Sequence, residues 1–355
     1  MTKRCALALP VFAVLAAVPQ AAAQSAQAPG SGLRTPSNQR SIAEARSPKP
    51  EPRKAYAVPR TPWGDPRLEG TWSTDDSIGV PIERPAQFGD RLYFNEQELA
   101  DRAMRDELTR RQSLEERSAP APAGVGGTNP PSHWGEQGTR TARQTSFVVD
   151  PPDGRIPAVT PDAQRRAASR DRGSFGDGPF DGPDNFTNYD RCITRSVVGS
   201  IFPRPYGNGL DIVQGPGYVA IRHEMIHETR VIPLDGRPHV GPRMRLYMGD
   251  SRGRWEGDTL VVETANFTDR TSIGFNGNGL RHSEAMRLVE RFTRVDADTI
   301  QYEVTIDDPK TYTRPFKMAV PMTTQPGYQI FEYACHEGNY GLPNILRGAR
   351  VEEKR

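Results

Sequence analysis

Residues 300–306 read IQYEVTI, and this stretch decides the fold class. Its apolar residues Ile300, Tyr302, Val304 and Ile306 alternate strictly with polar ones. Successive side chains of a β-strand point to opposite faces, so this two-residue period predicts a strand with one face in a core and the other in water. The Asp-Ala-Asp run at 296–298 supplies the turn before it.

The surrounding sequence repeats this pattern. Residues 256–258 read Glu-Gly-Asp between two apolar runs, which is typical of a β-hairpin. Further strands are predicted at 218–232, 312–322 and 328–334. About eight strands with short connections predict a mainly β fold, an antiparallel meander that closes into a barrel or a strongly curved sheet. Lipocalin-like barrels often open with a Gly-x-Trp, and residues 70–72 here read Gly-Thr-Trp.

One or two peripheral helices are expected beside the sheet. Residues 96–116 are rich in Leu, Ala, Glu and Arg, and Asn95 is followed three residues later by Glu98, as in a capping box. Thr160 followed by Pro161 predicts the start of a second, short helix.

The N-terminal part divides into two segments outside the predicted domain. Residues 1–23 combine Lys3 and Arg4, an uncharged apolar stretch and a closing Ala-Ala-Ala, the pattern of a secretory signal peptide. Residues 24–60 are rich in Ala, Pro, Ser and Arg and are expected to be a disordered linker. A single β-rich domain is then expected over 61–350, in the periplasm or secreted, with no membrane span.

Cleavage of the signal peptide leaves two cysteines, Cys192 and Cys335. An even pair in an oxidising compartment favours a disulfide, and closure of so long a loop contributes about 4–5 kcal/mol in the chain-entropy description. Two separate buried thiols are the alternative. Neither cysteine lies in a Cys-x-x-Cys pair, so the sequence gives little support to a redox or zinc-thiolate site.

The charges are balanced, with 46 basic and 44 acidic residues and a net charge of +2. Because the arginines are interleaved with acids, no basic stripe forms and no nucleic-acid partner is expected. The sequence has no phosphate-binding or dinucleotide-binding glycine motif, and no cofactor is expected. The oligomeric state is left open.

His223, Glu224 and His227 spell His-Glu-x-x-His. On a helix this spacing brings two imidazoles onto one zinc ion and offers the glutamate as general base. Yet residues 219–231 alternate as in a strand, on which the two histidines would lie about 13 Å apart at ~3.3 Å per residue. We favour the strand and expect no metal site; the zinc peptidase is an alternative that requires a helix here.

A second set of candidates lies at strand ends. Asp250, Arg254, Trp255 and Glu256 share one predicted hairpin. A histidine beside a carboxylate can serve as general acid or base near neutral pH, whereas ordinary cross-strand ion pairs would also explain the hairpin charges. The remaining members are His282 and Glu284, at the start of one predicted strand, and His336, after the last one.

Three runs resemble a large group of uncharacterised secreted bacterial proteins: EMIH at 224–227 followed by Arg230, MGDSRGRWEGDTLVVET at 248–264, and YACHEGNY at 333–340. The resemblance covers about 191–350. It implies export and a β-rich fold and brings no established activity; in that group position 223 need not be histidine. The positions that match the pattern are Glu224, His227, Arg230, Asp250, Arg254, Glu256, His336 and Glu337.

Three hypotheses follow for the function. The leading one is a periplasmic protein that binds a small organic molecule, which it could transform by metal-free acid–base chemistry. In it His227 is the base, Glu224 or Asp250 orients that base, and Arg254 holds an anionic group. The alternatives are the zinc-dependent peptidase and a non-catalytic envelope protein, and the sequence does not decide whether the protein is an enzyme. The catalytic candidates are His227, Glu224, Asp250 and His336, and the binding candidates are Arg230, Arg254, Trp255, Glu256, His282 and Glu284.

Overall fold

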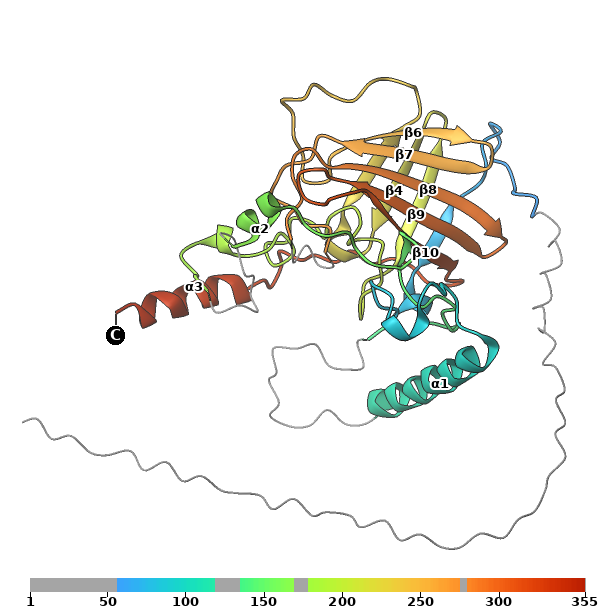
Figure 1. The fold of residues 1–355 in the computed structure, drawn as a ribbon, viewed down its shortest axis with the longest axis horizontal. Helices are drawn as coiled ribbons and strands as arrows, with labels where there is room; N and C mark the ends of the chain where they lie inside the picture. Colours follow the sequence, from blue (N-terminus) through green and yellow to red (C-terminus); the bar gives the residue numbers. More distant parts are fainter. Residues whose placement is uncertain (1–55, 119–134, 169–177, 275–279, 355) are drawn as a thin grey trace, which may run out of the picture. The chain divides into compact units, whose positions relative to one another are not determined.

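The computed structural model describes residues 56–118, 135–168, 178–274 and 280–354 (Figure 1). The predicted signal peptide and all but the last residues of the predicted linker lie outside these ranges. Both segments, and the single-domain boundary at 61–350, therefore stay predictions.

The described residues form one antiparallel sheet, which confirms the mainly β fold. Its neighbouring strands follow the order β5-β4-β3-β1-β10-β9-β8-β7-β6, and β2 pairs with β10 off this path. The ten strands are β1 (Gly70–Ser73), β2 (Val148–Asp150), β3 (Leu210–Gly215), β4 (Tyr218–His223), β5 (Thr229–Pro233), β6 (Asp250–Glu256), β7 (Thr259–Ala265), β8 (Arg287–Asp296), β9 (Thr299–Asp307) and β10 (Phe316–Thr324).

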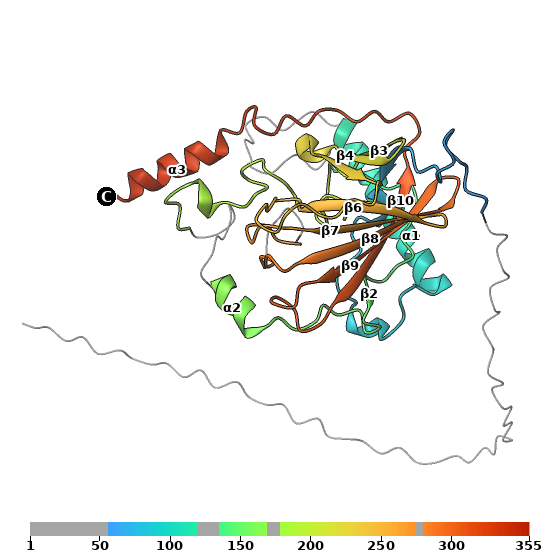
Figure 2. The same cartoon turned by 90° about the horizontal axis from the view of Figure 1, so that it is seen from above.

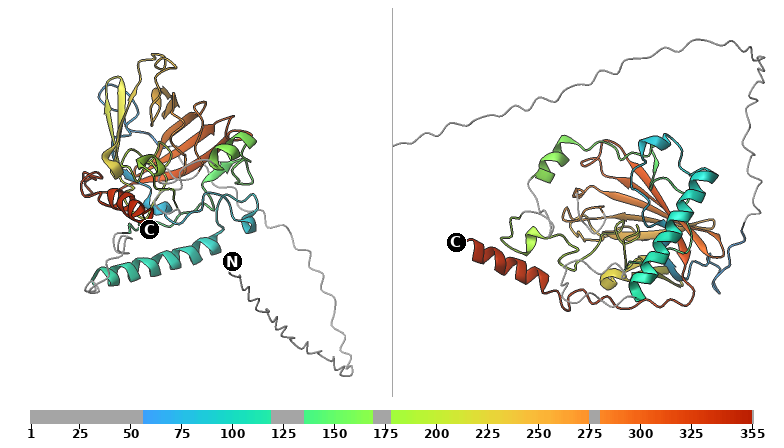
Figure 3. Two further views of the ribbon diagram at one scale, coloured as in Figure 1. Left: turned by 90° about the vertical axis from the view of Figure 1, so that its left-hand side faces the viewer. Right: turned by 90° about the horizontal axis from the view of Figure 1, so that it is seen from below.

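The sheet is strongly curved (Figures 1, 2 and 3). Its two edge strands, β5 and β6, contact each other. Gly253 of β6 lies close to β5, because a Cβ at this position would come within 2.8 Å of Cγ2 of Ile232 on β5. A side chain at position 253 would therefore require the side chains of Leu234 and Ile232 to shift. The predicted closure is thus confirmed as a nearly closed barrel.

The stretch that predicted the fold is β9. Its apolar residues at 300, 302, 304 and 306 are fully buried and alternate with half-exposed polar ones. The hairpin between β6 and β7 turns at Gly257, whose φ of 61° lies in the left-handed region that glycine favours. At the β8–β9 turn, the amide of Asp298 donates to Oδ1 of Asp296 at 3.0 Å.

Within the described ranges, three helices accompany the sheet: α1 (Glu96–Ser118), α2 (Pro161–Ala168) and α3 (Gly341–Glu352). The capping box of α1 is confirmed, since the amide of Glu98 donates to Oδ1 of Asn95 at 2.8 Å and the amide of Asn95 donates to Oε2 of Glu98 at 2.9 Å. The third helix was not predicted, because Gly341 and Gly348 lower its helix propensity. None of the helices in the described ranges is long and apolar enough to cross a bilayer.

Two predicted strands need correction. The run at 218–232 is broken, because β4 ends at His223 and a short 3-10 turn, η5 (Met225–His227), precedes β5. Ile226 in this turn has a φ of 65°, which neither a strand nor a helix allows. Residues 328–334 form no strand, since β10 is already paired with β9, β1 and β2 and offers no free edge. We call residues 325–340, between β10 and α3, the strap.

Candidate functional site

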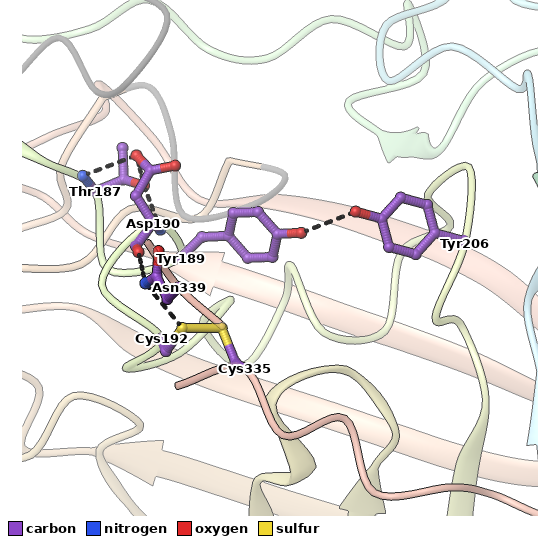
Figure 4. Close-up of a disulfide and its surroundings, with 7 residues drawn as sticks. All are labelled: Thr187, Tyr189, Asp190, Cys192, Tyr206, Cys335 and Asn339. Atoms are coloured by element: carbon purple, nitrogen blue, oxygen red, sulfur yellow. Dashed lines mark hydrogen bonds between the residues drawn. A yellow bond between two sulfur atoms is a disulfide. The ribbon is translucent and has the colours of Figure 1, made fainter. Parts of the chain in front are cut away.

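A disulfide fastens the strap to the loop that precedes β3 (Figure 4). Cys192 and Cys335 are joined with a Cα–Cα distance of 5.6 Å, which confirms the predicted bridge. Nearby, Nδ2 of Asn339 donates to the carbonyl of Asp190 at 3.0 Å. The strap is therefore held at two points by a segment more than 140 residues away in sequence.

Two adjacent cavities lie along the strap, and we call them together the strap cleft. Both are lined by Glu332 and Tyr333. The smaller cavity, of about 260 Å³, is also lined by Glu136, Tyr206, Gly207, Glu224 and Phe331. The larger one, of about 580 Å³, is also lined by Phe186, Tyr189, Asp190, Cys192, Ala334, Cys335, Glu337, Gly338, Asn339, Gly341, Leu342 and Ile345.

Glu224 stands in the wall of the smaller cavity. The end of β4 places it there, because its amide donates to the carbonyl of Gly209 at 2.9 Å. Its side chain accepts a hydrogen bond from the hydroxyl of Tyr328 in the strap, whereas its buried Oε2 has no hydrogen-bond partner in the described part of the chain. A Cβ at Gly209 would lie 2.8 Å from this Oε2, so glycine leaves the room that the carboxyl group needs.

A second carboxyl group, that of Glu136, faces the same cavity. Its Oε1 accepts from the amide of Gly207 at 2.8 Å. Nδ2 of Asn208 lies 3.0 Å from Oε2 of Glu136 and 2.8 Å from Oδ1 of Asp75, so one amide group holds both acids together. Burial first, and then the neighbouring Asp75, raise the pKa of Glu136 to about 8. Glu136 is therefore protonated at neutral pH.

Two tyrosines line the cleft beside these acids, and Arg195 lies behind its wall. The hydroxyls of Tyr189 and Tyr206 are 3.4 Å apart (Figure 4). Arg195 is buried and donates through Nη1 to the carbonyl of Gly207 at 3.1 Å, and burial lowers its pKa to about 10. Burial also raises the pKa of Tyr189, which keeps that hydroxyl protonated. The cleft thus joins a protonated acid, a hydrogen-bond acceptor and the hydroxyl groups of two half-buried tyrosines.

Of the predicted catalytic residues, the structure places Glu224 in this cleft. The backbone of His227 lies in η5, three residues after Glu224 of the cleft wall. Its side chain is outside the described part of the structure, so its role as base stays a prediction. His336 is exposed on the strap next to the disulfide. Asp250 lies on β6, where it binds Nδ1 of His239 at 2.9 Å and Nη1 of Arg252 at 2.8 Å.

The predicted hairpin residues form a surface network away from the cleft. Nε of Arg254 donates to Glu256 at 3.0 Å, and Nη1 of Arg291 donates to the other oxygen of Glu256 at 2.9 Å. Trp255 is half-buried and packs against the core. Cross-strand ion pairing explains these charges, so the geometry does not join them to the strap cleft.

Three further binding candidates also lie elsewhere. Arg230 points into the barrel and is ion-paired with Glu290. His282 is buried against Phe267, with ring centroids 5.3 Å apart, and Glu284 is exposed and paired with Arg245.

The helix that the zinc-peptidase hypothesis requires is not present. His223 ends β4 with its side chain buried, and neither ring nitrogen has a hydrogen-bond partner among the described residues. Burial and the nearby Arg230 lower its pKa to about 3. Across the described ranges, no three His, Cys, Asp or Glu side chains are grouped so that they could hold a metal ion.

Several residues of the cleft were missed by sequence reasoning. Asp75, Glu136, Arg195 and Asn208 come from loops and a 3-10 turn that show no periodic pattern. Glu136 stands in a glycine-rich stretch that reads Gly-Glu-Gln-Gly, which resembles any polar loop. A single sequence holds no signal that singles these residues out.

Comparisons of the chain with protein-family models, with curated proteins and with solved structures found no match.

Proposed function

We propose that the protein binds a small organic molecule in the strap cleft and exchanges a proton with it through Glu136 and Glu224. The observation that carries this proposal is the buried Oε2 of Glu224, which has no partner among the described residues at a cavity wall. An unsatisfied buried acceptor costs about 1–3 kcal/mol, and a donor on a bound ligand would offset this cost.

The pairing of Glu136 with Glu224 supports the acid–base part. A carboxylic acid that keeps its proton at neutral pH can donate it to a ligand, as catalytic acids with raised pKa values do. Glu224 supplies a second carboxyl group at the same cavity. The clustering of perturbed groups at one concave site favours a functional role over a structural one.

A thermal-shift screen of the full chain tests the binding. Neutral, anionic and cationic metabolites are compared on the wild-type protein, on Glu224→Gln and on Glu256→Gln, a matched control whose side chain lies outside the cleft. We expect at least one compound to raise the melting temperature of the wild-type and control proteins and to lose this effect in Glu224→Gln. If no compound of any charge does so, the binding proposal is wrong and the non-catalytic envelope protein becomes the better hypothesis.

Proton exchange is tested on the compounds that bind. If a bound compound is converted, we expect the rate to fall as the pH rises through about 8, because Glu136 then loses its proton. Glu136→Gln should abolish this pH dependence. Binding without any conversion would contradict the catalytic half of the proposal and leave the binding half standing.

We also propose that the protein acts in the periplasm or outside the cell. The disulfide supports this location, because such bonds persist in oxidising compartments, and so does the signal-peptide pattern at 1–23. Fractionation of cells that express the full chain checks it. Retention of the protein in the cytoplasm would contradict the proposal.

A further inference from the structure

We infer that the ligand of the strap cleft is a protonated amine. This inference rests on the proposed function, which places a small molecule there, and adds the chemical class of that molecule.

Among the residues whose side chains the structure describes, five carboxyl-bearing ones line the two cavities of the cleft, and no Lys, Arg or His does so: Glu136, Asp190, Glu224, Glu332 and Glu337. Glu136 keeps its proton at neutral pH, so any negative charge of the cleft comes from the other four. Arg195 lies behind the wall and points its Nη1 at the carbonyl of Gly207. A ligand that enters the cleft therefore meets carboxyl groups, which favours a positive charge.

Another cavity of this protein is lined by both acidic and basic residues, so an excess of acids is not a property of all its cavities. It has about 340 Å³ and lies between α1 and the η1 turn (Asp75–Ser77). Four acidic residues line it, but four arginines do so as well: Arg102, Arg105, Arg110 and Arg140. Opposite charges cancel there, whereas the described side chains of the strap cleft, which shares Glu136 with this cavity, include acids and no basic group.

Aromatic rings complete the walls of the cleft. Tyr206, Phe331 and Tyr333 line the smaller cavity, and Phe186 and Tyr189 line the larger one. Phe331 is 70% exposed and Tyr333 is 37% exposed, so their ring faces are not covered by the protein core. Aromatic faces next to carboxylates attract ammonium groups through the negative potential of the ring.

The position of Glu224 points to an amine in particular. Glu224 is 8% exposed, and its Oε2 lacks the hydrogen-bond donor that a buried acceptor needs. A protonated amine supplies both this donor and a compensating charge, which an anion or an ether cannot do. A metal ion fits less well, because within the described ranges no three suitable side chains are grouped to hold one.

Calorimetric titration of the full disulfide-bonded chain with matched compounds tests the inference. Phenethylamine, benzylamine and cadaverine are each compared with the alcohol of the same skeleton, and phenylacetate and calcium serve as anionic and metal probes. We expect at least one amine to bind about tenfold or more tightly than its alcohol, which is the range that a desolvated ammonium–aromatic contact adds to a carboxylate pair. Glu224→Gln should remove this preference, and Glu256→Gln should keep it.

A second variant keeps the test decisive if Glu224→Gln does not fold. Tyr333→Ala truncates a partly exposed ring, and we expect it to weaken amine binding about three- to thirtyfold while the alcohol is unaffected. Equal or tighter binding of an alcohol, phenylacetate or calcium at the cleft overturns the amine assignment and leaves the proposed function standing. Failure of every probe and of the wider metabolite screen overturns both.

Discussion

Arg230 on β5 and Glu290 on β8 form a buried bidentate ion pair inside the barrel. Nη1 lies 2.5 Å from Oε2 and Nη2 lies 2.9 Å from Oε1, and the hydroxyl of Tyr302 donates to Oε1 at 3.1 Å. Strand β5 is one edge of the sheet, and β8 is the third strand from the other edge. The pair therefore joins the two sides of the nearly closed barrel through its interior.

Breaking this pair should destabilise the protein strongly. Glu290→Gln leaves the Arg230 charge buried without its counter-charge, so we expect the free energy of unfolding to fall by about 3–5 kcal/mol. Replacing both partners together, by Arg230→Met with Glu290→Leu, should recover most of this loss. Urea denaturation measures both variants.

The exposed pair of Arg254 and Glu256 provides the comparison for that experiment. Glu256→Gln should change the free energy of unfolding far less than Glu290→Gln does, because a surface pair is screened by solvent. An equal loss of unfolding free energy in Glu256→Gln and Glu290→Gln would contradict the distinction between the buried and the exposed pair.

Removal of the disulfide should loosen the strap. The double variant Cys192→Ser with Cys335→Ser is expected to lose about 2–5 kcal/mol of stability, since the unfolded chain is no longer constrained. Amide exchange at 325–340 should rise far more than exchange in β9, because the bridge holds the strap and not the sheet. Unchanged exchange in the strap would show that other contacts hold it.

Glu136 should make the stability depend on pH. Its pKa is about 8 in the folded protein against 4.5 as the ordinary value, so the folded state binds a proton that the unfolded state has released. This contribution is fully present below pH 4.5 and is lost as the pH rises toward 8. Wild-type protein should thus lose stability across this window.

Glu136→Gln is the control for this pH effect. Thermal or urea unfolding curves measured at several pH values should show that the stability of the variant changes less between pH 4.5 and 8 than that of the wild type. The groups that face Glu136 are Asp75, Arg195 and Tyr328. If the stability of the variant depends on pH as strongly as that of the wild type, another group of this cluster binds the proton.

Loss of the capping box should fray α1 locally. Asn95→Ala removes the acceptor for the amide of Glu98, which typically costs about 1 kcal/mol of helix stability. Amide exchange should accelerate over the first turns of α1 and stay unchanged in α3. Thr109→Ala, in the interior of the same helix, should leave the first turns protected.

Zinc content tests the geometry of η5. We expect the mature protein, purified from the periplasm without chelator, to hold no stoichiometric zinc, because a kinked 3-10 turn does not set positions 223 and 227 on one helical face. Elemental analysis measures this directly. One zinc per chain that disappears in His227→Ala would revive the peptidase hypothesis.

Some features of the structure were readable from short stretches of sequence. The alternation at 300–306 predicted β9, the Asn95–Glu98 spacing predicted the start of α1, and the Gly257 turn predicted a hairpin. Each depends on contacts between residues close in the chain. The disulfide between Cys192 and Cys335 is long-range, and it was predictable because the predicted cleavage after residue 23 would remove Cys5 and leave these two cysteines.

The candidate site was only partly predictable. The sequence predicted Glu224 as a site residue but placed it in a strand. In the structure Glu224 lies at the start of the η5 turn. The sequence did not predict the second acid, Glu136, as a site residue. Its raised pKa arises from burial beside Asp75, which lies 61 residues earlier in the chain. Arg254 and Glu256 looked like site residues, since the sequence does not tell an outward from an inward charge.

By itself, the sequence determined the periodic strands and the helix start at Asn95, because side-chain alternation and local hydrogen bonds act within a few residues. Tertiary structure alone decided that the strap lies across the end of β4, that Glu224 and Glu136 face one cavity, and that Arg230 turns inward to Glu290. These outcomes depend on how burial removes water from groups far apart in the chain, and no local pattern encodes which groups will share a cavity.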